Sequence, residues 1–209
     1  LLSLGHALFF AAGLYGAILG GHMPALAQSV TSRLGFAIAD VRVSGNRETS
    51  DIDILGALGL DGWTSLIGFS TEAARQRVAA LPWVESASVR KVYPATVLVA
   101  IEERVPFAIW QHEGQLSLIE RDGTVIGPLS GLRHADLPLV VGEGGAKGAA
   151  GIVARLGKFP ALAGRVKGYI RVGERRWDLR LDNGVTVKLP ELGEEAAIAA
   201  LAGMDREEG

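Results

Sequence analysis

The chain has 209 residues, which is long enough for one large domain or two small domains with hydrophobic cores of their own. Its formal net charge of −2 provides no general attraction to nucleic acid or to anionic lipid. The absence of cysteine excludes disulfide bonds, thiolate catalysis, zinc–thiolate sites and iron–sulfur clusters.

The N-terminal segment is apolar and carries no permanent charge from Leu1 to Gly21. Its polar side chains are Ser3, His6 and Tyr15. A helix of this length spans a hydrocarbon layer of about 30 Å, because each residue adds roughly 1.5 Å. We therefore predict a transmembrane anchor over residues 1–22, followed by a juxtamembrane segment over residues 23–36.

A secretory signal peptide is the alternative interpretation of the same segment. Ala25-Leu26-Ala27 followed by Gln28 has the Ala-x-Ala pattern of a cleavage site. The apolar run is longer than the roughly 7–15 residues of a signal peptide core, which favours an uncleaved anchor.

The next predicted elements are a strand and two helices. Residues 37–44 alternate in polarity and lead into a Gly-Asn turn, which is typical of a strand. Ser50 is placed to cap a short helix that ends at Gly59. Ser70 is placed to cap a second helix, which continues to Leu81 and is ended by Pro82.

Two strands follow, residues 85–92 and 96–103, with Tyr93-Pro94-Ala95 as the turn between them. Val97, Val99 and Ile101 lie on one face of the second strand. The predicted order over residues 37–105 is therefore strand, helix, helix, strand, strand.

Residues 106–209 predict a second, mainly antiparallel β domain with helices, which makes the whole chain an α+β protein. The expected strands are residues 107–112, 115–120, 137–141, 166–172, 177–181 and 185–189. The last two are joined by Asp182-Asn183-Gly184, a strong hairpin signal. Helices are expected over residues 149–159 and 191–208, and glycine-rich Gly142–Gly148 is interpreted as a flexible loop.

The sequence offers no convincing catalytic or metal site. The candidates for paired acid and base are Glu102, Glu103, Glu120 and Asp122. Glu102 and Glu103 are adjacent on a strand and therefore point to opposite faces. The four histidines lack the spacing of a helical metal pair, and no serine has the G-x-S-x-G context of a nucleophile. We expect no enzyme activity, metal or cofactor.

Three stretches resemble the FtsQ family of bacterial cell-division proteins. They are Val41–Arg47, Leu81–Trp110 with its Leu-Pro-Trp-Val and Tyr-Pro motifs, and Arg175–Gly184. The first resembles the opening of the POTRA domain of that family, the second resembles the family's sequence across its two domains, and the third resembles a strand pair of its β domain. Together they cover most of residues 37–190.

The resemblance implies a single-pass inner-membrane protein whose C-terminal domains lie in the periplasm at the division septum. There it would act as a non-enzymatic scaffold that links early and late divisome proteins. The implied partners are FtsB and FtsL, with FtsK as a further candidate, and neither nucleic acid nor a small-molecule substrate is implied. A POTRA adaptor for outer-membrane protein assembly or secretion is the alternative function.

Arg175, Arg176 and Trp177 match the β-domain stretch near the FtsB-binding surface of the family. An arginine pair beside an exposed strand suits a partner's carboxylate, while the strand itself accepts a paired segment. The alternative is that one arginine is solvated and Trp177 belongs to the core.

Val89, Arg90 and Lys91 match the second POTRA strand, where upstream divisome proteins dock in the family. Strand alternation alone also explains this pattern. The family continues beyond the tail helix into further strands, so we expect the β domain here to be truncated at its C-terminal end. The sheet would then have an open edge at Val185–Leu189.

Overall fold

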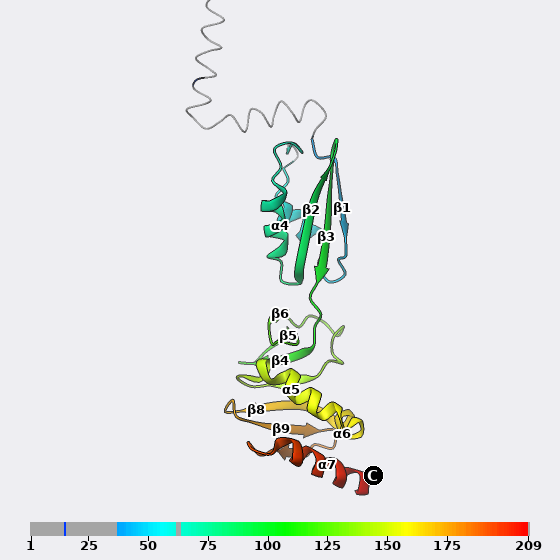
Figure 1. The fold of residues 1–209 in the computed structure, drawn as a ribbon, viewed down its shortest axis with the longest axis vertical. Coiled ribbons are helices and arrows are strands. Elements are labelled where there is room, and N and C mark those ends of the chain that lie inside the picture. Colours follow the sequence, from blue (N-terminus) through cyan, green and yellow to red (C-terminus); the bar gives the residue numbers. More distant parts are fainter. Residues whose placement is uncertain (1–14, 16–36, 62–63, 209) are drawn as a thin grey trace, which may run out of the picture. The chain divides into compact units, whose positions relative to one another are not determined.

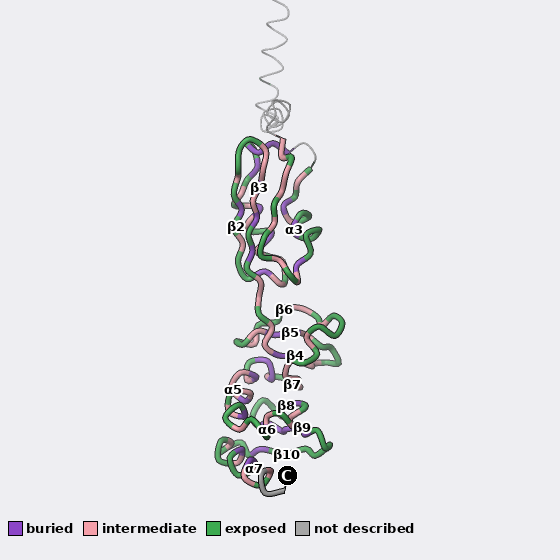
Figure 2. The backbone as a smooth tube through the Cα atoms, turned by 90° about the vertical axis from the view of Figure 1, so that its right-hand side faces the viewer, coloured by how far each residue is buried: buried purple, intermediate pink, exposed green. Residues whose placement is uncertain are grey.

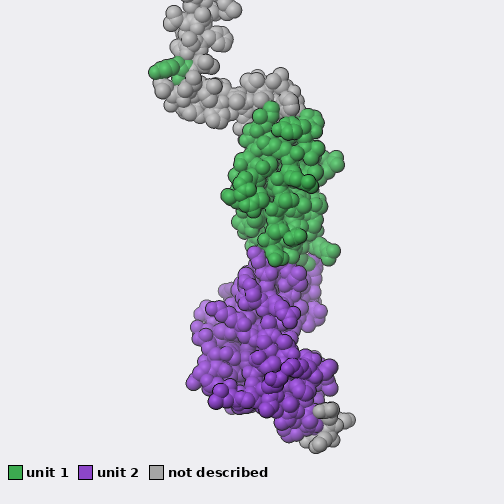
Figure 3. Space-filling model, in the orientation of Figure 1, with its two compact units in different colours: residues 1–103 green, residues 104–209 purple. Residues whose placement is uncertain are grey.

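The structure is a computed structural model that describes Tyr15, residues 37–61 and residues 64–208. Apart from Tyr15, the predicted anchor, the juxtamembrane segment and the alternative cleavage site lie outside the described residues. Within the described part of the chain, no helix is both long and apolar enough to cross a membrane. The chain divides into two compact units between Glu103 and Arg104 (Figure 3).

The first unit is a three-stranded sheet with two helices (Figure 1). Its elements in chain order are β1 (Asp40–Ser44), α3 (Asp51–Leu58), α4 (Thr71–Ala79), β2 (Val84–Val92) and β3 (Thr96–Glu103). The sheet order is β1-β3-β2, with β1 parallel and β2 antiparallel to the central β3. The predicted order of strand, helix, helix, strand, strand is confirmed.

Local capping explains where both helices begin. The Ser50 side chain accepts a hydrogen bond from the backbone N–H of Ile52, and the Ser70 side chain accepts one from Ala73. These bonds satisfy N–H groups that have no partner within the helix. Gly59 ends α3 in the left-handed conformation, with a φ of 63° that glycine adopts without strain.

The core of the first unit lies between the sheet and the helices. Val97, Val99 and Ile101 of β3 are buried, as their alternation predicts. They belong to the same cluster as Ile54 of α3 and Val78 of α4. Figure 2 marks the buried positions along the backbone in purple. The other face of this sheet carries the intervening residues and is not covered by a helix of the described residues.

Glu103 fixes the loop between β1 and α3 to the end of β3. Its carboxylate accepts hydrogen bonds from the backbone N–H groups of Glu48, at 3.1 and 3.0 Å, and Thr49, at 2.7 Å. Partial burial by itself raises the pKa of this carboxyl, but these backbone bonds and one from Arg47 outweigh that effect. The pKa of Glu103 therefore lies below its usual range.

The second unit is built on a seven-stranded sheet with the order β10-β9-β8-β7-β4-β5-β6. Its strands are β4 (Ala108–His112), β5 (Gln115–Ile119), β6 (Val125–Pro128), β7 (Leu139–Val141), β8 (Val166–Val172), β9 (Arg176–Leu181) and β10 (Thr186–Lys188). Strand β7 is parallel to both its neighbours, and the other neighbouring pairs are antiparallel. The sheet is thus mainly antiparallel, as predicted.

Three helices cover one face of this sheet: α5 (Gly145–Gly157), α6 (Pro160–Arg165) and α7 (Glu194–Glu208). Each contributes to the hydrophobic cluster that includes Trp177 and Leu179 of β9. Trp177 is only 1% exposed and is among the largest fully buried side chains of the described residues. The face to which Trp177 points is therefore the helix-covered face.

Gly142–Gly148 is not a flexible loop, because α5 already begins at Gly145 rather than near residue 149. A Cβ atom on Gly145 would lie 2.9 Å from Cγ1 of Val140, and one on Gly148 would lie 2.7 Å from Cζ2 of Trp177. These glycines allow the helix to approach the sheet closely. The sequence analysis interpreted these glycines as a flexible loop, because the side chains that they pack against cannot be identified from the local sequence.

Two elements were not predicted. Strand β6 contains Gly127 and Pro128, which are usually turn residues, but it lies at the edge of the sheet, where proline is tolerated. Helix α6 is a short turn of helix that begins with Pro160, whose fixed φ suits the first helical position.

We predict that Gly148→Ala lowers the free energy of unfolding of the second unit by roughly 1–3 kcal/mol, because the added methyl group overpacks the Trp177 ring. Gly157→Ala in the same helix is the control, since a Cβ atom there has no heavy atom within 4 Å. That variant should be neutral or slightly stabilising. Urea denaturation followed by tryptophan fluorescence measures the free energy of unfolding of both variants. Equal values for the two variants would show that the contact at Gly148 does not limit the size of the residue there.

We predict that Glu103→Gln lowers the free energy of unfolding of the first unit at pH 7 by about 1 kcal/mol, because the charge behind three hydrogen bonds is lost. The folded-state pKa lies below the unfolded value, so the carboxylate stabilises fully above about pH 4.3. This stabilisation is lost as the pH falls through the folded-state pKa. The difference in free energy of unfolding between the parent and Glu103→Gln should therefore become smaller as the pH is lowered. Urea titrations at several pH values measure it, and a difference that does not change with pH would contradict this account.

Candidate functional site

The described sheet of the second unit ends at β10, which pairs with β9 on one side only. The backbone N–H of Leu181 donates to the carbonyl of Val185, and that of Leu189 donates to the carbonyl of Trp177. Hydrogen-bonded residues alternate along an antiparallel pair. Thr186 and Lys188 therefore direct their N–H and C=O groups away from β9, toward the edge.

This edge is short and has a defined end. Pro190 follows Leu189 and has no N–H group to donate to an added strand. Thr186 and Lys188 are exposed, and Val185 beside them is 50% exposed. The edge thus offers the backbone groups of two residues, which is the arrangement that β-strand addition requires.

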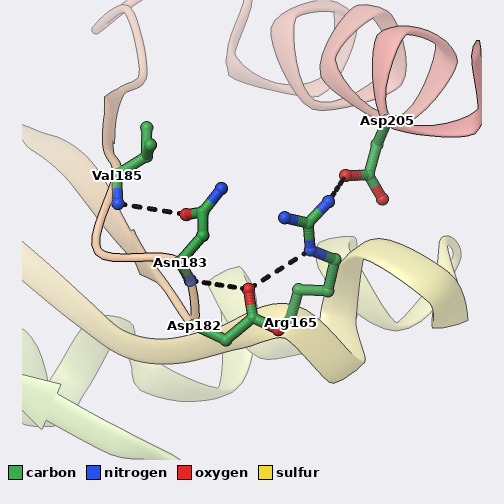
Figure 4. Close-up of polar contacts among 5 residues, drawn as sticks. All are labelled: Arg165, Asp182, Asn183, Val185 and Asp205. Carbon is green, nitrogen blue, oxygen red and sulfur yellow. Dashed lines mark hydrogen bonds and ion pairs between the residues drawn. The ribbon is translucent and has the colours of Figure 1, made fainter. Parts of the chain in front are cut away.

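A polar cluster holds the β9–β10 turn in place (Figure 4). Arg165, at the end of α6, binds Asp182 of the turn, with 3.3 Å between Nε and Oδ1, and also binds Asp205 of α7. Within the turn, the backbone N–H of Asn183 donates to Asp182, and that of Val185 donates to the Asn183 side chain. The start of β10 is therefore tied to helices α6 and α7.

Arg175 and Arg176 have different surroundings. Arg175 lies in the turn between β8 and β9 and is exposed. Arg176 is half-buried, and its Nε lies 3.3 Å from Oδ1 of Asp178. That is an ion-pair distance without hydrogen-bond geometry. Asp178 is only 7% exposed, so Arg176 is engaged with a buried carboxylate of its own strand.

Trp177 has no surface to offer a partner. Its ring is 1% exposed, and the guanidinium carbon of Arg171 lies 4.9 Å from the ring centroid. The ring also meets α5 at Gly148. Direct contact of Trp177 with a partner is therefore not available in this fold, and the residue belongs to the core, because strand alternation turns it away from Arg176.

Val89, Arg90 and Lys91 of β2 likewise do not form one surface. Val89 is 9% exposed and belongs to the core of the first unit. Arg90 is exposed on the other face of the sheet, in register with Leu98 of β3. Lys91 returns to the helix-covered side, where its Nζ donates to the carbonyl of Ile67 at 3.2 Å.

The carboxylates considered for catalysis have separate structural partners. Glu102 accepts a hydrogen bond from the Ser86 hydroxyl, whereas Glu103 binds backbone N–H groups of the β1–α3 loop. The carboxylate of Glu120 is paired with Arg104 at 2.5 Å, and that of Asp122 accepts bonds from Thr124. Among the described residues, no group of three or more His, Asp or Glu side chains is placed to hold a metal ion.

Comparison with known families matches both units of the chain. Residues 36–104 match the family described as "POTRA domain, FtsQ-type". Residues 108–208 match the family described as "Cell division protein FtsQ/DivIB, C-terminal". The two matches follow one another in the chain and meet near the division between the two compact units.

Relatives from three bacteria carry the same printed name, "Cell division protein FtsQ". The protein of Rhizobium radiobacter is 52% identical over 161 residues, which cover 77% of this chain and 77% of the relative. That of Agrobacterium fabrum is 53% identical, covering 94% of this chain and 62% of the relative. That of Rhizobium meliloti is 54% identical, covering 95% of this chain and 64% of the relative. The chain thus spans less than two thirds of the length of the last two relatives.

Proposed function

The chain belongs to the FtsQ family of cell-division proteins, and we propose that it is a non-enzymatic divisome scaffold of the inner membrane. In this role it links early and late cell-division proteins through contacts made in the periplasm. The observation that carries the proposal is the succession of an FtsQ-type POTRA domain and an FtsQ/DivIB C-terminal domain in one chain. Both matches are specific to this family, and neither favours an outer-membrane assembly adaptor.

The proposed organisation follows the sequence. Residues 1–22 form a single membrane anchor, residues 23–36 a juxtamembrane segment, residues 37–105 the POTRA domain and residues 106–209 the β domain. The uncharged run from Leu1 to Gly21 supports the anchor.

We propose that the β10 edge is where the sheet is extended when the β domain binds FtsB and FtsL. Thr186 and Lys188 supply the backbone groups of the edge, and the Lys188 side chain adds a positive charge. Arg180 donates to the Thr186 hydroxyl at 2.9 Å and lies on the same face of the sheet. A partner segment with acidic side chains on that face suits these charges.

On the POTRA domain, Arg90 is the exposed residue among Val89, Arg90 and Lys91. We propose that Arg90 makes the contact with an upstream divisome protein, for which FtsK is the candidate. Val89 supports the strand from the core, and Lys91 holds the loop at Ile67.

The absence of enzyme activity is part of the proposal. The carboxylates Glu102, Glu103, Glu120 and Asp122 are each bound to a different structural partner. The hollow of about 680 Å³ beside β7 contains Asp136 and Lys167 as its charged residues and includes none of these four. In the described part of the chain, these four carboxylates are therefore not arranged as a pair for acid and base catalysis.

The experiment that tests the divisome role is the position of a fluorescent fusion of the full-length protein in dividing cells of its own species. We expect accumulation at the constriction site. An even distribution around the envelope would contradict the proposal and would favour the outer-membrane assembly adaptor.

For the edge, we predict that Lys188→Pro in the full-length protein weakens capture of the purified FtsB–FtsL complex at least tenfold, or about 1.4 kcal/mol. Proline removes an N–H group that points away from β9, so the β9–β10 pair itself is retained. Lys188→Ala is the matched control, because it removes the charge and keeps the N–H group. Equal affinities of the two variants, with equal thermal unfolding, would show that the backbone edge is not used.

The same assay tests the arginines when they are changed one at a time. Arg175→Glu reverses an exposed charge and leaves the Arg176–Asp178 pair intact. A change at Arg176 would leave the buried carboxylate of Asp178 without its ion-pair partner, so loss of capture would then mix binding with folding. Loss of capture by Arg175→Glu alone is therefore the informative result.

A further inference from the structure

Several exposed apolar side chains lie at one end of the first unit. Tyr93 is 62% exposed, Ile67 49% and Val92 43%. Val92 and Tyr93 lie where β2 passes into its turn, and Ile67 lies in the loop that precedes α4. The two connections are joined by the bond from Lys91 Nζ to the carbonyl of Ile67 at 3.2 Å. We call Ile67, Lys91, Val92 and Tyr93 the Tyr93 tip.

The chain enters the first unit at this same end. The backbone N–H of Ile38 donates to the carbonyl of Thr64 at 3.0 Å, and that of Ala39 donates to Ala95 at 2.9 Å. Ala37 also forms a bridge with Ser65. Residues 37–39 thus lie between the two connections that carry the tip.

The apolar run that ends at Gly21 is separated from Ala37 by residues 22–36 alone. Fully extended, such a segment reaches about 50 Å at most. A surface tethered within that distance of a membrane meets it at a high effective concentration. The Tyr93 tip is on the tethered end of the unit, whereas Asn46–Thr49 and the end of β3 are at the opposite end of the sheet.

The chemistry of the tip suits the boundary between lipid and water. Tyrosine is enriched at that boundary, and lysine extends its charged end toward water while its alkyl stem stays in apolar surroundings. The tip carries a single positive charge, on Lys91, beside three apolar side chains, and nearby Arg42 is paired with Asp40. The expected contact is therefore apolar rather than electrostatic.

A second exposed apolar pair in the same unit, Ile52 and Leu55 of α3, lacks these properties. Ile52 is 79% exposed, but Asp51 and Asp53 lie beside it in the first turn of the helix. Two carboxylates next to the apolar side chains oppose insertion among lipid headgroups. The two patches can therefore be told apart by charge.

We propose that the Tyr93 tip rests in the headgroup region of the membrane that carries the anchor of this chain. The inference rests on the anchored topology of the proposed function. The tip provides a second membrane contact beside the anchor and so limits the orientations of the first unit over the bilayer. The ligand is the phospholipid surface itself.

The absence of cysteine allows a direct test by single-cysteine labelling of the full chain. The protein is reconstituted into vesicles of phosphatidylethanolamine and phosphatidylglycerol with brominated acyl chains, and a fluorophore is attached to Ile67→Cys. Ala12→Cys reports the anchor, and exposed Arg47→Cys at the opposite end of the unit is the control. We expect the brominated lipids to quench the fluorescence of labels at positions 12 and 67 but not of a label at position 47.

Adding Tyr93→Asp to the Ile67→Cys protein should reduce quenching at position 67 several-fold without changing thermal unfolding, because the tyrosine is exposed. Vesicles without phosphatidylglycerol should give the same quenching, and a loss there would overturn the apolar contact. Quenching at position 12 but not at position 67 overturns the tip contact and leaves the anchor in place. Absence of quenching at both positions overturns the tip contact and the anchored topology together.

Discussion

The contact between the Trp177 ring and Gly148 is the interaction on which the arrangement of the second unit depends. A helix that carried a side chain at position 148 would be held away from the sheet, since its Cβ would lie 2.7 Å from the ring. With Trp177 fixed inward, strand alternation places Arg176, Asp178 and Arg180 on the opposite face. The core contact therefore decides which charges flank the open edge, although none of those charges takes part in the core.

The helices and strands of the first unit were predicted from local sequence patterns. Each helix begins at a serine that caps it, and the strands alternate in a way that identifies Val97, Val99 and Ile101 as core. Such signals are read within a few residues and do not depend on distant contacts. For the same reason the hairpin at Asp182–Gly184 and the strand after it were predicted from sequence.

Features that depend on distant contacts were not predicted. The glycines at 145 and 148 resemble a flexible loop until Val140 and Trp177 are placed against them. The sequence placed Arg175, Arg176 and Trp177 near a partner-binding surface, with a core position for Trp177 as the alternative; in the structure Trp177 is buried and Arg176 faces Asp178. Burial of a carboxylate is set by neighbours on adjacent strands, here Ile170 and Lys188, which no local pattern identifies.

The open edge alone does not explain how a partner is selected. Backbone N–H and C=O groups are the same in every protein, so an edge strand pairs with many extended segments. Selection must come from the flanking side chains. On β9 the Arg176 charge is already opposed by Asp178, while Arg180 lies beside β10, Lys188 lies in β10 and Arg175 lies in the turn before β9. The unopposed charge is thus divided between the edge and the turn. A partner that binds both must extend past the two outward-facing residues of β10, and this length requirement distinguishes a defined partner from an arbitrary unfolded segment.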